Sequence, residues 1–266
     1  MSSNLKVATI AINTVPCEPD ANLSALGRSL ELLEPDTDLV VLPELFSTGF
    51  VSDADTLADV AQTNGDSTIK TISELARRYN LAIAGSFAAR TGNHIYNRGF
   101  FIEPSGDETF YDKYHLFSLG DEARLFTAGD RPMPLIRYRG WTIAMIICYD
   151  LRFPVWSRNR NSAYDMLIVP ACWPNARAYA WEHLLIARAI ENQCCVVGAN
   201  RSGSDDYGSY DNSSYIFDAL GKSVGTRVSR RSAPAPILSA TLALDNVAEI
   251  RRRMPAAADA DPFQLL

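Results

Sequence analysis

The 266-residue sequence lacks the motifs that usually bind metals and nucleotides. No CxxC, HExxH or GxxxxGK[ST] pattern is present, and the three histidines, His94, His115 and His183, lie far apart along the chain. Such patterns supply zinc ligands or a phosphate-binding loop. Their absence favours a protein without a metal or nucleotide cofactor.

Runs of basic residues and long apolar runs are also missing. The net charge is −6 and the longest Lys/Arg run is 251–253, which gives no electrostatic footprint for nucleic acid or an anionic membrane. The uncharged apolar run over 141–149 is far shorter than the ~20 residues that span a bilayer, and the N-terminal apolar stretch is too short for a secretory signal. We therefore expect a cytoplasmic protein whose partner is a small molecule.

The cysteines do not form a disulfide framework. Their number is odd, their spacing is irregular, and the chain is large enough to fold without covalent staples. We expect five reduced thiols, at Cys17, Cys148, Cys172, Cys194 and Cys195.

What is present is an alternation of two kinds of segment. Short runs of Val, Ile, Leu and Ala are typical of strands buried on both faces, and they span 7–12, 38–42, 81–84, 142–147, 165–169 and 195–197. Helical patterns separate them, at 22–33, 67–79 and 176–192. In the last helix, Leu184, Leu185, Ala187 and Ala189 are expected to form the buried side. The alternation predicts an α/β fold.

The two halves of the sequence repeat one plan. Residues 38–43 and 165–170 both read Asp, four apolar residues and Pro, and each is followed by a helix and a strand that ends in Gly. A third match sets 100–106 against 215–221, with an acid and a Gly at equal offsets. Three matches in the same order predict a duplicated half. Two similar sheets would then pack face to face with helices outside, as a four-layer sandwich.

We expect one domain over residues 1–255. Its last elements are a strand at 237–244 and a short helix at 247–253. The C-terminal tail, 256–266, is Ala-rich and polar before an apolar end. Such a tail is typical of a frayed segment or of an arm that lies on a partner subunit.

Three segments at predicted strand ends or in loops contain reactive side chains: LPELF with Glu44, YDKYHLF with Lys113, and IICYDLRFP with Cys148. Each side chain also has an ordinary structural interpretation, as a loop acid, a surface charge and a small buried hydrophobe. Their positions favour function, because ligands usually bind at the carboxyl ends of strands in open α/β sheets, and Glu44 and Cys148 directly follow apolar strands.

These residue types suit nucleophilic attack on an amide. Cys148 is the nucleophile, Glu44 takes the thiol proton, and the Lys113 ammonium stabilises the oxyanion together with a backbone N–H. The N–H of Tyr149, just after the nucleophile, is a natural donor by analogy with the nucleophile elbow. Glu44 then gives its proton to the departing ammonia, and afterwards deprotonates the water that hydrolyses the thioester.

With PELF, DKYHLF and CYDLRFP in this order, the sequence resembles the nitrilase, or carbon-nitrogen hydrolase, superfamily over residues 5 to about 250. The resemblance implies a Glu-Lys-Cys triad formed by Glu44, Lys113 and Cys148. It also implies that Glu122 in LGDEARLF helps to position the substrate, and that the fold is an α-β-β-α sandwich. Relatives of this kind are commonly homodimers or larger homo-oligomers.

Within the superfamily, CYDLRFPVWSRN, the Trp173-Pro174 pair and RAIENQ are most similar to the omega-amidases. That resemblance implies hydrolysis of the distal amide of 2-oxoglutaramate or 2-oxosuccinamate. The far carboxylate of such a substrate needs a cationic or donor group, for which Arg177 and Arg201 are candidates, although both also suit ion pairs or the surface. Trp173 follows the strand that repeats the Glu44 strand and is a candidate for a pocket wall.

Three other interpretations are open. A Cys-His hydrolase would use His115 or His183, but neither has an obvious orienting acid, since adjacent residues such as Glu182 and His183 point in different directions on a helix. A binding module on the same fold would keep the pocket without turnover. An enzyme with the same mechanism and a different substrate would act on a nitrile, an N-carbamoyl amine or another aliphatic amide.

Overall fold

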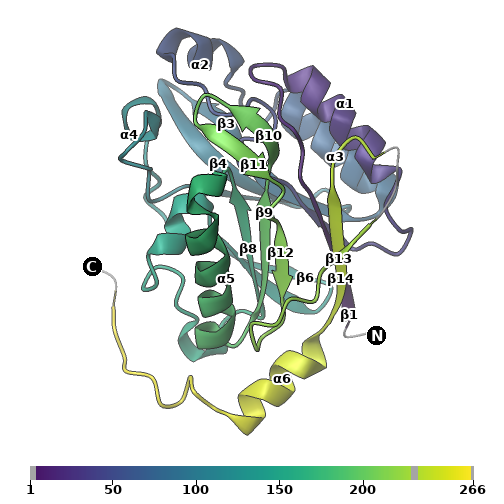
Figure 1. Cartoon of the computed structure of the whole chain (residues 1–266), viewed down its shortest axis with the longest axis vertical. Coiled ribbons are helices and arrows are strands. Elements are labelled where there is room, and N and C mark those ends of the chain that lie inside the picture. The colour runs from purple at the N-terminus through teal and green to yellow at the C-terminus, as the bar shows by residue number, and fades with distance from the viewer. Residues whose placement is uncertain (1–3, 229–232, 265–266) are drawn as a thin grey trace.

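A computed structural model describes residues 4–228 and 233–264. Two mixed β-sheets pack face to face, and helices cover the outer face of each sheet (Figure 1). The predicted α/β class and the four-layer α-β-β-α arrangement are confirmed.

The first sheet has seven strands among the described residues, in the order β13 (Thr226–Arg227), β14 (Ile237–Ala243), β1 (Asn4–Ile10), β2 (Leu39–Val41), β3 (Ala82–Thr91), β4 (His94–Ile102) and β5 (Glu108–Asp112). The second has five, in the order β12 (Tyr215–Phe217), β9 (Cys195–Asn200), β8 (Met166–Ala171), β7 (Trp141–Met145) and β6 (Leu135–Tyr138). A separate hairpin pairs β10 (Ser202–Asp205) with β11 (Gly208–Asp211).

Helices α1 (Pro19–Leu30) and α3 (Ser67–Tyr79) pack on the first sheet, and α5 (Ala178–Asn192) packs on the second. The other helical segments are α2 (Ala54–Val60), α4 (Glu122–Leu125), α6 (Leu244–Arg253) and the short 3-10 turns η1 (Cys148–Arg152), η2 (Arg160–Ser162) and η3 (Asn175–Arg177). Among the described residues, no helix has both the length and the apolar character required to cross a membrane.

Alternation of side chains along the strands divides the apolar residues between two cores. In β2, Leu39 and Val41 pack between the two sheets, whereas Val40 packs under α1 and α3. In β8, Ile168 packs between the sheets and Leu167 packs under α5. Because successive strand residues point to opposite faces, strands covered on both sides are apolar throughout.

The buried stripe of α5 differs from the prediction. Leu184 and Ala187 are only partly buried, and the stripe runs through Trp181, Leu185 and Ala189. These three positions are spaced by four residues, so they lie on one side of the helix, and the Trp181 ring is the largest of the three side chains.

The predicted relation between the two halves agrees with the strand topology. The run β14-β1-β2-β3-β4 has pairings that are antiparallel, parallel, parallel and antiparallel. The run β6-β7-β8-β9-β12 repeats the same four pairings in the same order.

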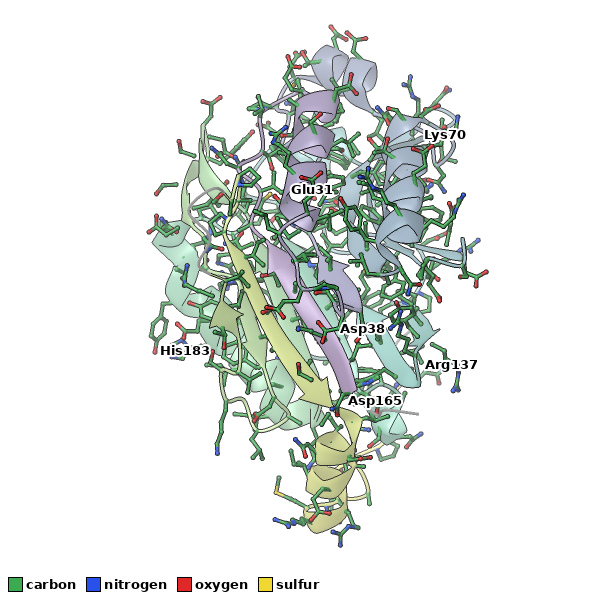
Figure 2. The ribbon with its side chains drawn as sticks, turned by 90° about the vertical axis from the view of Figure 1, so that its right-hand side faces the viewer. Glu31, Asp38, Lys70, Arg137, Asp165 and His183 are labelled. Carbon is green, nitrogen blue, oxygen red and sulfur yellow. The ribbon has the colours of Figure 1, made fainter. Side chains whose placement is uncertain are left out.

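The repeated Asp has the same structural role in both halves. An Asp38 carboxylate oxygen accepts a hydrogen bond from the Lys6 backbone N at 2.8 Å, and an Asp165 oxygen accepts one from the Thr142 backbone N at 3.0 Å. Both acids lie near the ends of the sheets, away from the helices α1 and α3 (Figure 2). Each Asp therefore joins the start of one strand to the strand beside it.

The C-terminal region is close to its prediction. Helix α6 begins at Leu244, earlier than the predicted start at 247. The described part of the tail has no helix or strand, and near its end the Phe263 carbonyl accepts a hydrogen bond from Arg160 at 3.4 Å. The last two residues of the predicted tail, 265–266, lie outside the described residues.

Candidate active site

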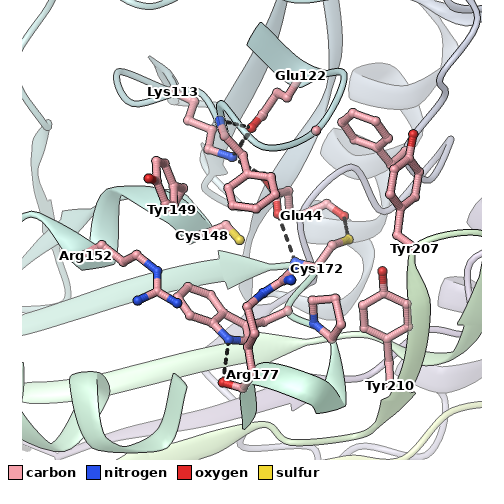
Figure 3. A pocket seen from close by; sticks show the side chains of 15 residues that line it. Glu44, Lys113, Glu122, Cys148, Tyr149, Arg152, Cys172, Arg177, Tyr207 and Tyr210 are labelled. Carbon is pink, nitrogen blue, oxygen red and sulfur yellow. Dashed lines mark hydrogen bonds and ion pairs between the residues drawn. The ribbon is translucent and has the colours of Figure 1, made fainter. Parts of the chain in front are cut away.

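Four chain segments bring polar side chains to one pocket between the two halves. Glu44 lies in the turn after β2, Lys113 directly follows β5, Glu122 begins α4, and Cys148 begins η1 after β7. All four residues line a pocket of about 650 Å³, a volume that includes its open mouth (Figure 3). The structure thus brings together the three predicted triad residues and the further predicted glutamate.

Cys148 occupies a strained turn that Asp150 holds in place. Its φ of 43° lies in the left-handed region, which is unfavourable for a residue with a Cβ atom. The carboxylate of the fully buried Asp150 accepts hydrogen bonds from the Ile147 backbone N at 3.1 Å, the Tyr111 hydroxyl at 2.8 Å and the His115 backbone N at 2.9 Å. These bonds fix the turn that directs the Cys148 side chain into the pocket.

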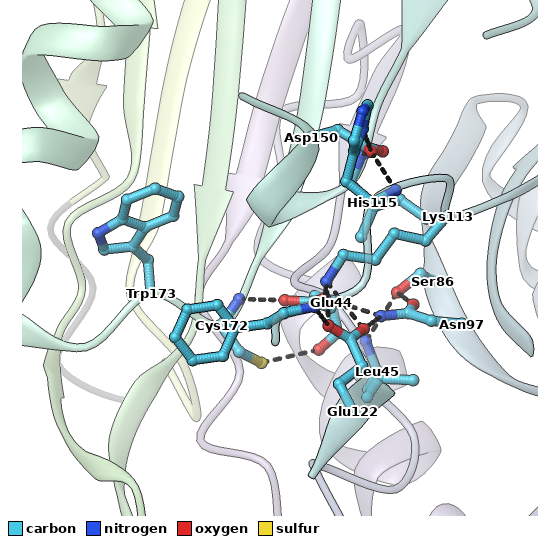
Figure 4. A network of polar contacts seen from close by, with 12 residues as sticks. Glu44, Leu45, Ser86, Asn97, Lys113, His115, Glu122, Asp150, Cys172 and Trp173 are labelled. Carbon is cyan, nitrogen blue, oxygen red and sulfur yellow. Dashed lines mark hydrogen bonds and ion pairs between the residues drawn. The ribbon is translucent and has the colours of Figure 1, made fainter. Parts of the chain in front are cut away.

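Lys113 lies between two carboxylates. Its Nζ is 2.8 Å from Glu44 Oε1 and 2.8 Å from both carboxylate oxygens of Glu122, and its side chain is 2% exposed (Figure 4). Asn97 Nδ2 donates to Glu44 Oε1 at 2.7 Å and to Glu122 Oε1 at 2.9 Å. Ser86 Oγ donates to Asn97 Oδ1 at 2.9 Å and thereby sets the orientation of that amide.

These charges determine the protonation of the site. Burial alone would lower the pKa of Lys113, but the carboxylates of Glu122 and Glu44 outweigh it and raise that pKa well above its usual range. Burial, together with the charge of Glu44, raises the pKa of the Cys148 thiol well above its usual range, and the Lys113 charge only partly opposes this. The raised pKa favours the neutral thiol form of Cys148.

Cys172 is a part of the site that the sequence reasoning missed. Its backbone N donates to Glu44 Oε2 at 2.9 Å, and its Sγ donates to the Glu44 carbonyl at 3.0 Å. Both oxygens of the Glu44 carboxylate are therefore held in place. The duplicated plan could have shown it, because Cys172 follows the strand β8 that repeats the strand before Glu44.

Aromatic and cationic side chains form the pocket walls. The Tyr149 ring packs edge-on against Phe117 at 5.1 Å, and Trp173 is 3% exposed with its Nε1 donating to the Arg177 carbonyl at 2.8 Å. The guanidinium of Arg177 lies 5.3 Å from the centre of the Phe117 ring, and that of Arg152 lies 4.9 Å from the centre of the Trp173 ring. Tyr149, Trp173 and Arg177 all line the pocket, and Arg152 is a lining residue that the sequence interpretation did not name.

Both guanidinium groups in the pocket are available for an anion. Among the described residues, no carboxylate lies within ion-pairing distance of Arg152 or Arg177, and both are exposed. Arg152 occupies the last position of η1, the turn that begins at Cys148. Its place four residues after Cys148 in the sequence could have identified Arg152 as a pocket residue.

The structure contradicts the carboxylate-binding role predicted for Arg201. This residue is 1% exposed, does not line the pocket, and forms an ion pair with Asp205 at 2.5 Å. Its second terminal nitrogen donates to the Thr14 carbonyl at 3.2 Å. Because its guanidinium is already paired and buried, Arg201 cannot receive a substrate carboxylate.

His115 and His183 do not line the pocket that contains Cys148. Contrary to the sequence expectation, His115 has an orienting acid, since its Nδ1 lies 2.7 Å from Asp150. Its ring is stacked on Phe153 at 3.8 Å and is not part of the pocket lining. His183 is exposed on α5, with Nδ1 2.8 Å from the Tyr179 carbonyl. This arrangement argues against a Cys-His hydrolase.

Comparison with known proteins gives the class of the chain. Residues 6–252 match the carbon-nitrogen hydrolase family, and the chain belongs to this family. It is 39% identical to omega-amidase YafV of Escherichia coli K12 over 98% of each chain. It is 32% identical to 2-oxoglutaramate amidase of Bacillus subtilis over 90% of each.

A solved structure agrees with this class. XC1258 from Xanthomonas campestris, a CN-hydrolase superfamily protein with an arsenic adduct in its active site, has a TM-score of 0.90 and 37% identity. The match covers 98% of this chain and 99% of that one. The resemblance seen in the sequence motifs is therefore confirmed at the level of the family.

Proposed function

We propose that the protein is an omega-amidase that hydrolyses the distal amide of 2-oxoglutaramate or 2-oxosuccinamate. One pocket supports this function: it contains the Cys148 thiol, the Glu44–Lys113 pair and two guanidinium groups that have no carboxylate partner within the described part of the chain. The names of the relatives, omega-amidase and 2-oxoglutaramate amidase, support the substrate class. The proposal needs no cofactor.

In the first half of the reaction, the Cys148 sulfur attacks the amide carbon as Glu44 takes the thiol proton. A C–S bond forms and the carbonyl π electrons move to oxygen. The Lys113 ammonium and the Tyr149 N–H stabilise this oxyanion; the latter lies in the first turn of η1, where N–H groups have no partner within the helix. The C–N bond then breaks, and Glu44 returns the proton to the departing nitrogen, which leaves as ammonia.

In the second half, water attacks the thioester carbon as Glu44 takes one of its protons. The C–S bond breaks, the acid is released, and the proton returns to the sulfur. Glu122 contributes by holding Lys113 in place through two 2.8 Å contacts. The Cys172 N–H at Glu44 Oε2 keeps the base oriented through both halves.

The substrate class is tested by ammonia release from a panel of compounds. The panel contains 2-oxoglutaramate, 2-oxosuccinamate, glutamine, a simple nitrile and an N-carbamoyl amino acid. We expect 2-oxoglutaramate and 2-oxosuccinamate to be the preferred substrates. Turnover of the nitrile or the carbamoyl compound alone would replace the omega-amidase assignment by another reaction of the same family, and no turnover of any member would favour a binding module.

Arg152 and Arg177 are predicted to bind the far carboxylate of the substrate. Replacing Arg152 or Arg177 with Gln removes a charge-assisted hydrogen bond of about 1.5–3 kcal/mol, so kcat/KM for 2-oxoglutaramate should fall roughly 10- to 100-fold, mainly through KM. Steady-state kinetics on 2-oxoglutaramate and on a small amide without a carboxylate measure this effect.

The uncharged amide should lose little activity in either variant. A matched control is Arg78→Gln, because Arg78 also lies over an aromatic ring, that of Tyr79 at 5.4 Å, but on α3 away from the pocket. Equal losses on both substrates would show that the arginines support the pocket structure and do not bind the carboxylate.

The proposal also includes a cytoplasmic location and assembly as a homodimer or larger oligomer. Two large side chains on α5, Tyr179 and Ile190, are 77% and 49% exposed. Their spacing of eleven residues places them on one side of the helix, which suits a contact with a second copy.

A further inference from the structure

The hairpin β10–β11 stands apart from both sheets and forms one side of the pocket. It contributes Tyr207, in its turn, and Tyr210, in β11, to the pocket lining. Gly208 follows Tyr207 with a φ of 142°, a conformation that favours glycine, so the turn is tight at this point. Figure 3 shows both tyrosines on the side of the pocket opposite Tyr149.

The base of the hairpin is anchored by the buried Arg201. Its guanidinium pairs with Asp205 at 2.5 Å and lies 4.7 Å from the centre of the Tyr210 ring. The Tyr210 hydroxyl donates to the same carboxylate at 3.1 Å. A buried, fully paired charge of this kind ties the hairpin to the body of the protein, since Arg201 also bonds the Thr14 carbonyl.

The turn of the hairpin contacts two other segments of the chain through Tyr207. The Tyr207 hydroxyl donates to Asp121 Oδ2 at 3.2 Å, and its ring packs edge-on against Phe50 at 4.9 Å. Asp121 directly precedes Glu122, which holds Lys113. Tyr207 is therefore the point at which the hairpin meets the segment that carries part of the catalytic cluster.

We propose that Tyr207 is a specificity-determining residue that closes this side of the pocket over a small amide. Arg201 positions it through Asp205, which also accepts a hydrogen bond from the Tyr207 backbone N at 2.9 Å. The ring of Tyr207 beside Phe50 forms the wall, and its hydroxyl fixes Asp121. The consequence for turnover rests on the proposed amide hydrolysis, whereas the closure of the pocket over Cys148 does not.

Closure is tested by the alkylation rate of Cys148 with iodoacetamide, followed by peptide mass mapping. Tyr207→Ala should raise the rate about tenfold, because the wall is removed. Tyr207→Phe keeps the ring and should raise the rate no more than about twofold. Cys194 and Cys195 are buried and report any unfolding, so their labelling should not change. The matched control Tyr79→Ala removes a partly buried ring on α3, outside the pocket lining, and should leave the Cys148 alkylation rate unchanged.

Turnover gives the second readout. Tyr207→Ala should raise KM for 2-oxoglutaramate about tenfold with kcat within about threefold. Asp121→Ala removes the contact with Tyr207 and also the ion pair with Arg124. The KM effects of Tyr207→Phe and Asp121→Ala should therefore sum to more than the KM effect of the double variant, because the Tyr207–Asp121 contact is lost in both.

An unchanged Cys148 alkylation rate in Tyr207→Ala would overturn the proposal, as would full additivity in the double variant. Absence of ammonia release from every panel compound would instead overturn the proposed function, and the alkylation result would still decide the role of Tyr207.

Discussion

Replacing Cys148 with alanine should abolish amide hydrolysis, with kcat/KM reduced by about 10⁴-fold or more. Without the sulfur there is no thioester, and Glu44 and Lys113 can only assist a direct attack by water. Two measurements check this: the rate of ammonia release, and the mass of the protein after rapid quenching during turnover. The unmodified protein should carry an acyl group on Cys148 and the variant should carry none.

The natural control for this variant is Cys172→Ala. Cys172 is the other thiol in the pocket, and its contact with the Glu44 carboxylate comes from the backbone N, which alanine retains. We expect a loss of about tenfold or less, because only the bond from Sγ to the Glu44 carbonyl disappears. If Cys172→Ala were inactive and Cys148→Ala active, the nucleophile would be Cys172.

Replacing Lys113 with methionine should affect both catalysis and stability. The oxyanion loses a charged donor, for which we expect a fall in kcat of about 10²- to 10³-fold. Methionine has a similar length, but the carboxylates of Glu44 and Glu122 are left buried without their cation. Removing one partner of a buried ion pair typically costs about 3–5 kcal/mol of the free energy of unfolding. Urea denaturation and steady-state kinetics measure the two effects separately.

The control for this change is Lys70→Met. Lys70 lies on the exposed side of α3, and its replacement should leave both the free energy of unfolding and kcat nearly unchanged. If Lys113→Met were as stable as the unmodified protein, the two carboxylates would not depend on Lys113 for their burial. If its kcat were also unchanged, the proposed oxyanion role would be wrong.

The sequence predicts the meeting of Glu44 and Cys148 because both follow central parallel strands, and the carboxyl ends of such strands share one edge of the fold. Lys113 follows β5, an antiparallel edge strand, so its position was implied by the family resemblance and not by strand direction. The buried ion pair of Arg201 could not be predicted in this way. Its pairing with Asp205 depends on a hairpin that no hydrophobic pattern marks.

The bounds of some helices and strands could be predicted from the local sequence, and those of others could not. Helix α3 has the predicted bounds, 67–79, because its apolar positions and the Asp66 that precedes it define it locally. Strand β3 was predicted to end at Ala84 but continues to Thr91. Its second part includes Ser86 and Arg90, and it is a strand because it pairs with β4, a contact that the local sequence does not contain.

The hydrogen bond from the Cys172 backbone N to Glu44 joins the two halves of the chain at the site. Glu44, Lys113 and Glu122 precede the second sheet in the chain, whereas Cys148 and Cys172 follow two of its strands, β7 and β8. Neither half holds both Cys148 and Glu44, the proposed nucleophile and its proposed base. If the chain were cut in the connection between β5 and β6, each fragment alone would therefore be inactive. Activity would require the two fragments to associate and bring Glu44, Lys113 and Cys148 together.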